Sequence, residues 1–196
     1  LDRPLPVQYF KWLEAVLKGD LGYSIARYGQ PVSEVVGERI FPTLQLSVSA
    51  LVAGALIAVP LGIISAVRRN SKVDYITTST ALLSVSVPNF FLAMLLICLF
   101  CLKLKLLPSN GMFTFGAART LPDTVRHMIL PCSVLAFGVA GNLVRYVRAG
   151  MTDVLDQDYM RTAKSKGLSS IRVIFKHGLK NAMNIIITAM AGQTAG

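Results

Sequence analysis

Charged residues in this sequence are gathered in blocks, and long uncharged stretches separate the blocks. Residues 40–67, 75–102 and 127–144 contain no Asp, Glu, Lys or Arg. A membrane-spanning helix needs about 20 consecutive, mostly apolar residues, and one charged side chain at its centre costs about 2.5–3.5 kcal/mol on the insertion scale. The uncharged stretches therefore predict spanning helices. Their expected positions are Thr43–Val67, Tyr75–Leu102 and His127–Val144.

Both ends of the sequence resemble the ends of a fragment. The chain starts with Leu1 and has no basic segment followed by an apolar one, so we expect no signal peptide in it. A further uncharged stretch follows Lys180, and we expect a fourth span to begin at Asn181. The natural protein is expected to be longer on both sides.

Prolines mark the irregular points of the predicted spans. Pro42 is expected at the start of the first span, where the missing N–H costs little. Pro60 predicts a kink near the inner end of that span, and Pro88-Asn89 predicts a break near the middle of the second. Gly141 in the third span predicts close approach of a neighbouring helix.

The composition argues against a soluble enzyme and against disorder. Hydrophobic residues make up 53% of the 196 residues and charged residues 15%, with a mean hydropathy of +0.55. Soluble domains carry roughly 25% charged residues, and disordered chains lack such an apolar fraction. The formal net charge of +10 lies in loops that we expect on both sides of a membrane, so we expect no nucleic-acid partner.

The distribution of basic residues predicts the orientation in the membrane. Loops Arg68–Asp74 and Arg145–Lys180 together hold 11 Lys and Arg in 43 positions, whereas Leu1–Arg39 and Lys103–Arg126 hold 9 in 63. The positive-inside rule places the denser pair in the cytoplasm. Residues 1–39 are then an extracytoplasmic segment. It is expected to contain an amphipathic interfacial helix over Pro4–Leu17.

Three further short helices are predicted, one before the first span and two in the cytoplasmic loop. Val32–Arg39 is expected to lead into the first span. Asp158–Lys166 reads as a short cytoplasmic helix that Gly167 ends, and a second helix is expected over Ser170–Lys180.

The sequence offers no catalytic, metal-binding or cofactor-binding constellation. Cys98 and Cys101 form a CxxC pair inside an apolar span, whereas redox and zinc pairs occupy polar, accessible turns. His127 and His177 are expected on opposite sides of the membrane. The sequence has no GxxxxGK[ST] motif for ATP. We therefore expect no enzyme activity, no metal and no cofactor in the chain itself.

The cytoplasmic segment carries the most specific pattern. Its central string is Asp158-Tyr159-Met160-Arg161-Thr162-Ala163-Lys164-Ser165-Lys166-Gly167. This string resembles the EAA loop of ABC importer permeases, in the form found in the oligopeptide/dipeptide/nickel subfamily. Arg161-Thr162-Ala163 holds the Glu-Ala-Ala position, with Gly167 in place. The sequence His177-Gly178-Leu179-Lys180 departs from the general Ile-x-Leu-Pro but is similar to the peptide subfamily.

Other stretches extend the resemblance over nearly the whole chain. They are Gly19–Ser24, Pro31-Val32, Arg39–Leu44, Ser86–Phe91 and Leu106–Gly111. The chain looks most like the first of two non-identical permeases. The resemblance implies an all-α integral membrane protein that holds spans two to four, and the start of span five, of about six. Residues 40–196 are then a truncated transmembrane permease domain with a coupling loop at 145–180.

The resemblance also implies a function and partners. The chain would be the transmembrane subunit of an ATP-driven importer of di- and oligopeptides in a bacterial or archaeal cytoplasmic membrane. Its partners would be a second homologous permease in a heterodimer, two cytoplasmic subunits that bind the ATP, an extracytoplasmic solute-binding protein and membrane lipid. The residues implied in ATPase coupling are Asp158, Tyr159, Arg161, Thr162, Ala163, Lys166 and Gly167.

The implied roles differ along the chain. Ala163 is expected to face the groove of the ATPase subunit, because a small side chain permits close approach, and Gly167 is expected at the turn. Pro88 and Asn89 are expected to line the pathway, because a helix break frees a carbonyl that lipid cannot satisfy.

Alternatives remain at this stage. The solute could be nickel or another small molecule, since these permeases share the motifs. A secondary carrier or channel would leave the cytoplasmic motif unexplained and lacks a charge deep in a span. A membrane-anchored enzyme or scaffold is a third class, and any single Lys or Arg of the loop could be an ordinary positive-inside residue.

Overall fold

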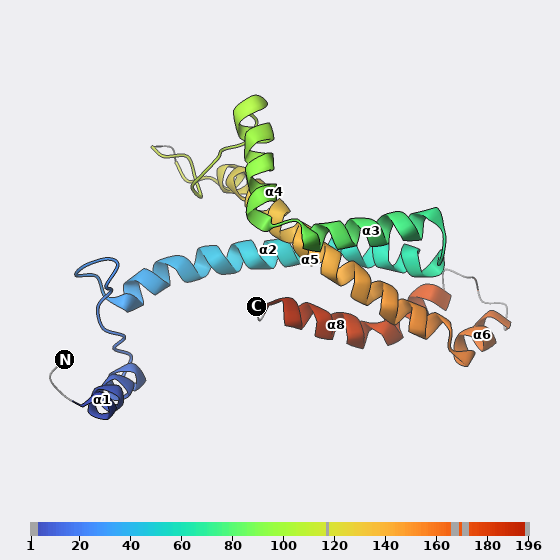
Figure 1. Ribbon diagram of the computed structural model, residues 1–196, viewed down its shortest axis with the longest axis horizontal. Helices are drawn as coiled ribbons and strands as arrows, with labels where there is room; N and C mark the ends of the chain where they lie inside the picture. The colour runs from blue at the N-terminus through green and yellow to red at the C-terminus, as the bar shows by residue number, and fades with distance from the viewer. Residues whose placement is uncertain (1–3, 117, 166–168, 170–172, 195–196) are drawn as a thin grey trace. The chain divides into compact units, whose positions relative to one another are not determined.

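The computed structural model describes residues 4–116, 118–165, 169 and 173–194 (Figure 1). Within these ranges the regular structure is helical, apart from one isolated β-bridge between Tyr23 and Pro31. The all-α expectation is therefore confirmed. The helices are α1 Leu5–Leu17, α2 Val32–Val67, α3 Lys72–Ser86, α4 Asn89–Leu96, η1 Ile97–Lys103, α5 Leu121–Leu155, α6 Asp158–Ser165, η2 Val173–Leu179 and α8 Lys180–Thr194. The chain divides into two compact units, residues 1–45 and 46–196.

The first unit contains α1 and the start of α2. Pro4 precedes α1, Lys18 caps its C-terminus, and Gly19 then adopts φ +85°, a conformation that glycine takes without steric cost. The helix buries none of its residues, which fits the predicted interfacial helix. After the turn, the Arg27 guanidinium pairs with the Glu38 carboxylate at 2.9 Å and so fixes the loop to the first turns of α2.

Helix α2 runs through Pro42 and Pro60 as one element of 36 residues. The helix therefore does not start at Pro42, and Val32–Arg39 is its first part and not a separate helix; where the span begins in the membrane stays a prediction. Near the first proline, the Thr43 hydroxyl donates to the Arg39 carbonyl at 2.8 Å. The carbonyl that Pro42 leaves without its helical N–H donor is that of Glu38, four residues earlier, so the Thr43 hydroxyl bonds the neighbouring carbonyl and not the freed one.

The predicted break at Pro88-Asn89 is confirmed, and it is larger than a kink. Helix α3 ends at Ser86, α4 begins at Asn89, and the axes on the two sides differ by 99°. Proline lacks an N–H and forces the residue before it into an extended conformation, and Val87 accordingly has ψ 122°. The Pro88 carbonyl then accepts the N–H groups of Phe91 and Leu92 and starts α4.

Among the described residues, two helices are long and apolar enough to cross a membrane, Val32–Val67 and Leu121–Leu155. The bent pair Lys72–Ser86 and Asn89–Lys103 passes the same test as one broken span. The described residues thus hold two candidate spans, and a third where the bent pair is counted as one span, as the sequence predicts.

Helix α5 is longer than the predicted span His127–Val144. It begins after Thr120, whose hydroxyl accepts the Asp123 N–H, and ends at Leu155. Arg145 and Arg148, predicted in a loop, therefore lie within the helix. The apolar face continues past the uncharged window, since Val147 and Met151 are fully buried, and this buried face explains why the helix does not stop there.

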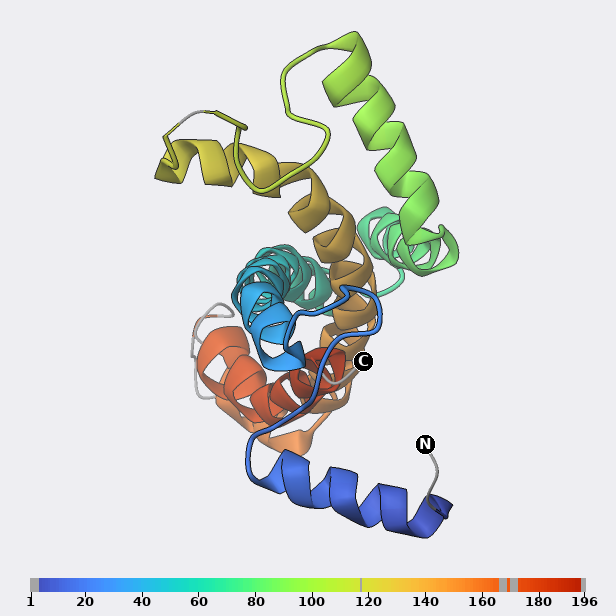
Figure 2. The same cartoon turned by 90° about the vertical axis from the view of Figure 1, so that its left-hand side faces the viewer.

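Helix α5 is the centre of the second unit, with α3 and α8 packed against it (Figure 2). Glycines set the closest approaches to it. A Cβ at Gly62 of α2 would lie 2.6 Å from Val147 Cβ, and one at Gly141 would overlap the Ser84 side chain of α3. The expectation that Gly141 permits close helix packing is confirmed.

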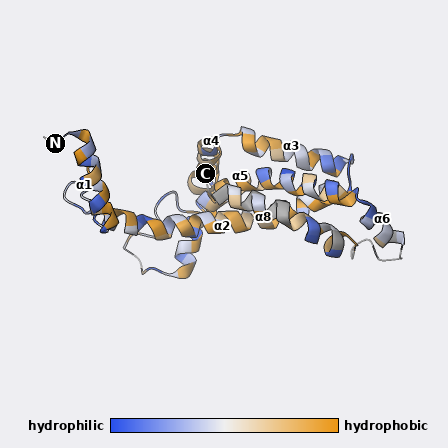
Figure 3. Cartoon of the chain, turned by 90° about the horizontal axis from the view of Figure 1, so that it is seen from below, coloured by the Kyte–Doolittle hydropathy of each residue, from blue (hydrophilic) through white to orange (hydrophobic). Residues whose placement is uncertain are grey.

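The cytoplasmic segment agrees only in part with the prediction. The first short helix is confirmed as α6 over Asp158–Ser165, while Lys166 and Gly167 lie outside the described residues. The second predicted helix does not end at Lys180. The described part begins as η2 at Val173 and continues directly into α8 at Lys180. In the second unit, hydrophilic residues gather at the end that holds the α2–α3 loop and the end of α5 (Figure 3).

Candidate coupling site

Helix α6 is held by its apolar face. Met160 is fully buried and Ala163 is 8% exposed, and residues three apart share one side of a helix. Both belong to a core cluster with Met151 and Val154 of α5 and with Val173 of η2. An eight-residue helix has little stability of its own, so this packing holds α6 in place.

The expected direction of Ala163 is wrong. Its side chain is buried inside this chain and cannot face the groove of another subunit. The small side chain permits close approach, as expected, but the approach is to the chain's own core. Ala163 therefore positions α6 and does not form its outer surface.

The opposite side of α6 is exposed. Asp158, Tyr159 and Thr162 have exposed side chains, with Tyr159 43% exposed. The Thr162 hydroxyl donates to the Asp158 carbonyl at 3.1 Å, and the Asn181 amide donates to the Tyr159 hydroxyl at 3.4 Å. The structure does not describe the side chain of Arg161. Three of the seven predicted coupling residues therefore form an outer surface of α6, which we call the α6 outer face.

Gly178, from the second part of the motif, lies against the same core. A Cβ there would come within 3.2 Å of Met151 Cε and 3.6 Å of Met160 Cε. Both atoms are the ends of flexible side chains, so a small shift of these methionines would make room for a Cβ. The small space beside Met151 and Met160 explains why a residue without a side chain stands at position 178.

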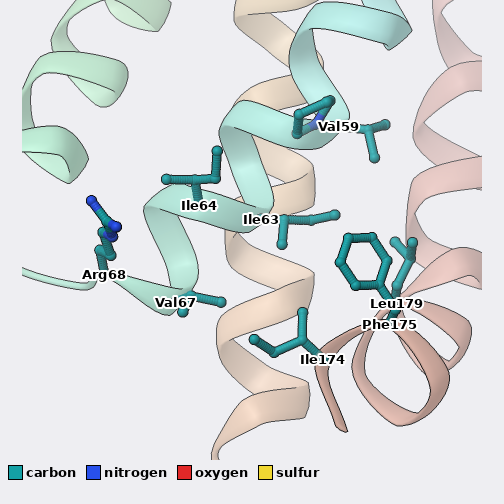
Figure 4. Close-up of a pocket in the computed structure, with 9 residues that line it drawn as sticks. Val59, Ile63, Ile64, Val67, Arg68, Ile174, Phe175 and Leu179 are labelled. Carbon is teal, nitrogen blue, oxygen red and sulfur yellow. The ribbon is translucent and has the colours of Figure 1, made fainter. Parts of the chain in front are cut away.

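An apolar groove of about 430 Å³ runs between α2 and the η2–α8 segment (Figure 4). Its lining is Val59, Pro60, Ile63, Ile64, Val67, Arg68, Ile174, Phe175 and Leu179. Arg68 supplies the charged side chain of this lining. The groove offers no arrangement of polar groups that would select a solute.

A polar cluster that sequence reasoning missed lies where α2, α3 and α5 meet. The Arg148 guanidinium holds the Asp74 carboxylate with two parallel hydrogen bonds, Nε–Oδ1 at 2.6 Å and Nη2–Oδ2 at 2.8 Å. The Ser65 hydroxyl and the Asn70 N–H also donate to this carboxylate. Asp74 is only 3% exposed, so its charge is compensated inside the protein.

A second contact joins the same loop to the end of α5. The Arg69 guanidinium lies 3.3 Å from the carboxylate of Asp156, the residue that caps α5 two positions before α6 begins. Both side chains are more than half exposed, so this pair contributes little stability by itself.

The predicted pathway residues lie at the bend. Pro88 and Asn89 are both exposed in this chain. A Cβ at Gly138 of α5 would lie 3.7 Å from the Asn89 side-chain oxygen, so α5 passes close to the break. Their role in a pathway stays a prediction.

Comparison with known proteins identifies the family of this chain. Residues 58–196 match the family described as binding-protein-dependent transport system inner membrane component. The chain belongs to this family of transport permeases. The family and the spanning helices indicate a multi-pass protein of the bacterial inner membrane.

Individual relatives are similar over almost the full chain. A Brucella suis protein that carries the name peptide permease is 45% identical over all 196 residues, which cover 61% of its own length. The oligopeptide transport system permease protein AppB of Bacillus subtilis is 42% identical over 188 residues, 96% of this chain and 60% of that protein. The dipeptide transport system permease protein DppB of the same organism is 41% identical over 196 residues, 100% of this chain and 60% of that protein. The chain thus spans about three fifths of the length of these relatives.

Proposed function

We propose that this chain is part of a transmembrane subunit of an ATP-driven importer of di- and oligopeptides. Membership of the binding-protein-dependent family supports an importer, and the names of the relatives support peptides as the solute. The subunit would form half of the translocation pathway. A second, homologous permease would form the other half, and an extracytoplasmic solute-binding protein would deliver the peptide.

The observation that carries the proposal is the construction of α6. A short helix at the EAA-type string is fastened to α5 and η2 by its apolar face and exposes the α6 outer face. A helix held in this way can bind another protein without losing its attachment to the membrane-spanning helices. We propose that two cytoplasmic subunits bind and hydrolyse ATP and that one of them receives the α6 outer face.

The proposal assigns different tasks to the coupling residues. Asp158, Tyr159 and Thr162 contact the ATPase subunit, and Arg161 and Lys166 contribute positive charge at the rim of the contact. Ala163 fixes the helix from behind. Gly167 allows the chain to turn between α6 and the following segment. Pro88 and Asn89 line the pathway at the bend.

Reconstitution of the whole complex in vesicles tests the function. Transport subunits, ATPases and binding protein are combined, and ATP hydrolysis and solute uptake are measured with di- and tripeptides and, separately, with Ni²⁺. We expect peptides to stimulate both hydrolysis and uptake. Stimulation by Ni²⁺ alone would replace the peptide assignment, and uptake without ATP would place the chain among secondary carriers.

A further inference from the structure

The Asp74 carboxylate connects three helices at one point. It is part of the first turn of α3, it accepts hydrogen bonds from Ser65 in the last turns of α2 and from Asn70 in the loop between them, and Arg148 of α5 holds both of its oxygens. The Asp74 side chain is 4% exposed and that of Arg148 30% exposed. We call these four residues the α2–α3–α5 clamp.

The geometry of the clamp resists both rotation and sliding. A carboxylate held by one hydrogen bond can pivot, but two parallel bonds to a planar guanidinium fix its orientation. If α5 moved along its axis past α3, both bonds would break together and leave a buried charge without its partner, which is strongly unfavourable. The clamp therefore favours a common movement of the three helices.

The clamp lies close to the start of α6. Arg148 and Asp156 are eight residues apart on α5, or about 12 Å at 1.5 Å per residue. The Arg69–Asp156 pair also lies at the end of that interval, two residues before α6, but both of its side chains are more than half exposed, so it adds little to the connection. The loop and α6 are at the same end of the second unit (Figure 1). Any displacement of α6 thus reaches α5 just beyond the clamp.

We propose that Asp74 and Arg148 are positioning residues for transport: their pair makes α2, α3 and the inner half of α5 one rigid body. A movement of α6 then passes into α3 and on to the bend at Pro88, in addition to moving α5. This inference rests on the proposed function, since it assumes that ATPase subunits move α6. It adds a second route of transmission, through the α2–α3 loop, that the coupling string does not supply.

Close glycine packing does not replace the clamp. Gly62 and Gly141 bring α2 and α3 against α5 through small or apolar surfaces. These contacts limit how closely the helices approach, whereas the bidentate ion pair also fixes the orientation of the Asp74 carboxylate relative to Arg148 and so ties α3 to one position along α5. The clamp is therefore the element that couples the inner ends of these helices.

The test compares variants of the complete transporter in vesicles and measures ATP molecules hydrolysed per peptide imported. Asp74→Asn and Arg148→Gln each leave a polar group near its normal position but remove the ion pair. We expect each to raise the ratio at least threefold. Arg148→Lys keeps the positive charge but loses the two parallel hydrogen bonds to the Asp74 carboxylate, so it should give an intermediate ratio. The matched control is Arg69→Gln, which removes an exposed pair from the same loop and should change the ratio less than twofold.

A double variant separates coupling from folding. Asp74→Asn combined with Arg148→Gln leaves no uncompensated buried charge, so assembly and thermal stability should recover relative to Arg148→Gln, which leaves the buried Asp74 carboxylate without its partner. The ratio should remain raised in the double variant, because the rigid connection is still absent. A normal ratio in an assembled double variant, or in Arg148→Lys, would overturn the proposal. A complex whose unchanged form shows no peptide-stimulated hydrolysis would instead refute the proposed function.

Discussion

The packing of α6 predicts a large effect of one buried methionine. Met160 is fully buried between α5 and η2, and removing a large side chain from a packed core costs about 2–5 kcal/mol. Since α6 has only eight residues and little stability of its own, most of this loss should fall on the attachment of the helix. Met160→Ala should therefore release α6 without unfolding the spanning helices.

Hydrogen exchange measures this release directly. A loss of about 2–5 kcal/mol corresponds to a protection factor roughly 30-fold to a few thousand-fold lower in α6, limited by the local stability of the unchanged helix. Thr162→Ala is the control, because it removes an exposed hydroxyl from the same helix and should alter protection by less than about threefold. Equal protection of α6 in the Met160→Ala variant and the unchanged protein would refute the reasoning.

Three further predictions follow from the spans, the glycine contacts and the N-terminal helix. In an otherwise cysteine-free protein in intact cells, Ser109→Cys should react with an impermeant thiol reagent and Ser71→Cys should not; the reverse pattern would invert the predicted orientation. Gly141→Leu should prevent α3 from packing on α5, because even a Cβ overlaps the Ser84 side chain, and should abolish assembly of the transporter as judged by co-purification; co-purification at the yield of the unchanged protein would contradict this contact. Trp12 is the one tryptophan of the sequence and is 55% exposed beside Tyr9 on α1. In vesicles, with any tryptophan outside residues 1–196 replaced by phenylalanine, brominated lipids should quench its fluorescence more than aqueous iodide does. Strong quenching by iodide alone would exclude an interfacial α1.

The sequence was sufficient for those elements that depend on local chemistry. Uncharged windows are set by the cost of placing charge in lipid, and they located the spanning segments. The break at Pro88 follows from the geometry of proline and of the residue before it, and it appears where expected. The amphipathic pattern of residues 4–17 likewise located α1.

Helix ends were less predictable because packing decides them. The charge at Arg145 indicates the end of a span, but it does not indicate the end of a helix, since α5 continues while its apolar face remains buried. Pro42 failed as a helix start for a related reason. A proline inside a long apolar helix costs one hydrogen bond, and the surrounding turns of α2 continue past it.

The candidate site shows the same limit more sharply. The residues 158–167 were sufficient to predict the position of α6. The burial of Ala163 also depends on where η2 packs, and no local sequence pattern specifies that packing. The Asp74–Arg148 pair joins residues 74 positions apart. Either residue alone reads as an ordinary charge near the end of a span, so the pairing required the structure.

Cross-linking from the α6 outer face tests the central claim most directly. In the complete, otherwise cysteine-free transporter, Thr162→Cys should form a cross-link to an ATPase subunit with a short bifunctional thiol reagent, and ATP should alter its yield. Ser109→Cys, expected on the opposite side of the membrane, should form none. The account predicts a specific Thr162→Cys product that is lost when Met160→Ala releases α6; absence of any product from Thr162→Cys in a complex that imports peptide would contradict it.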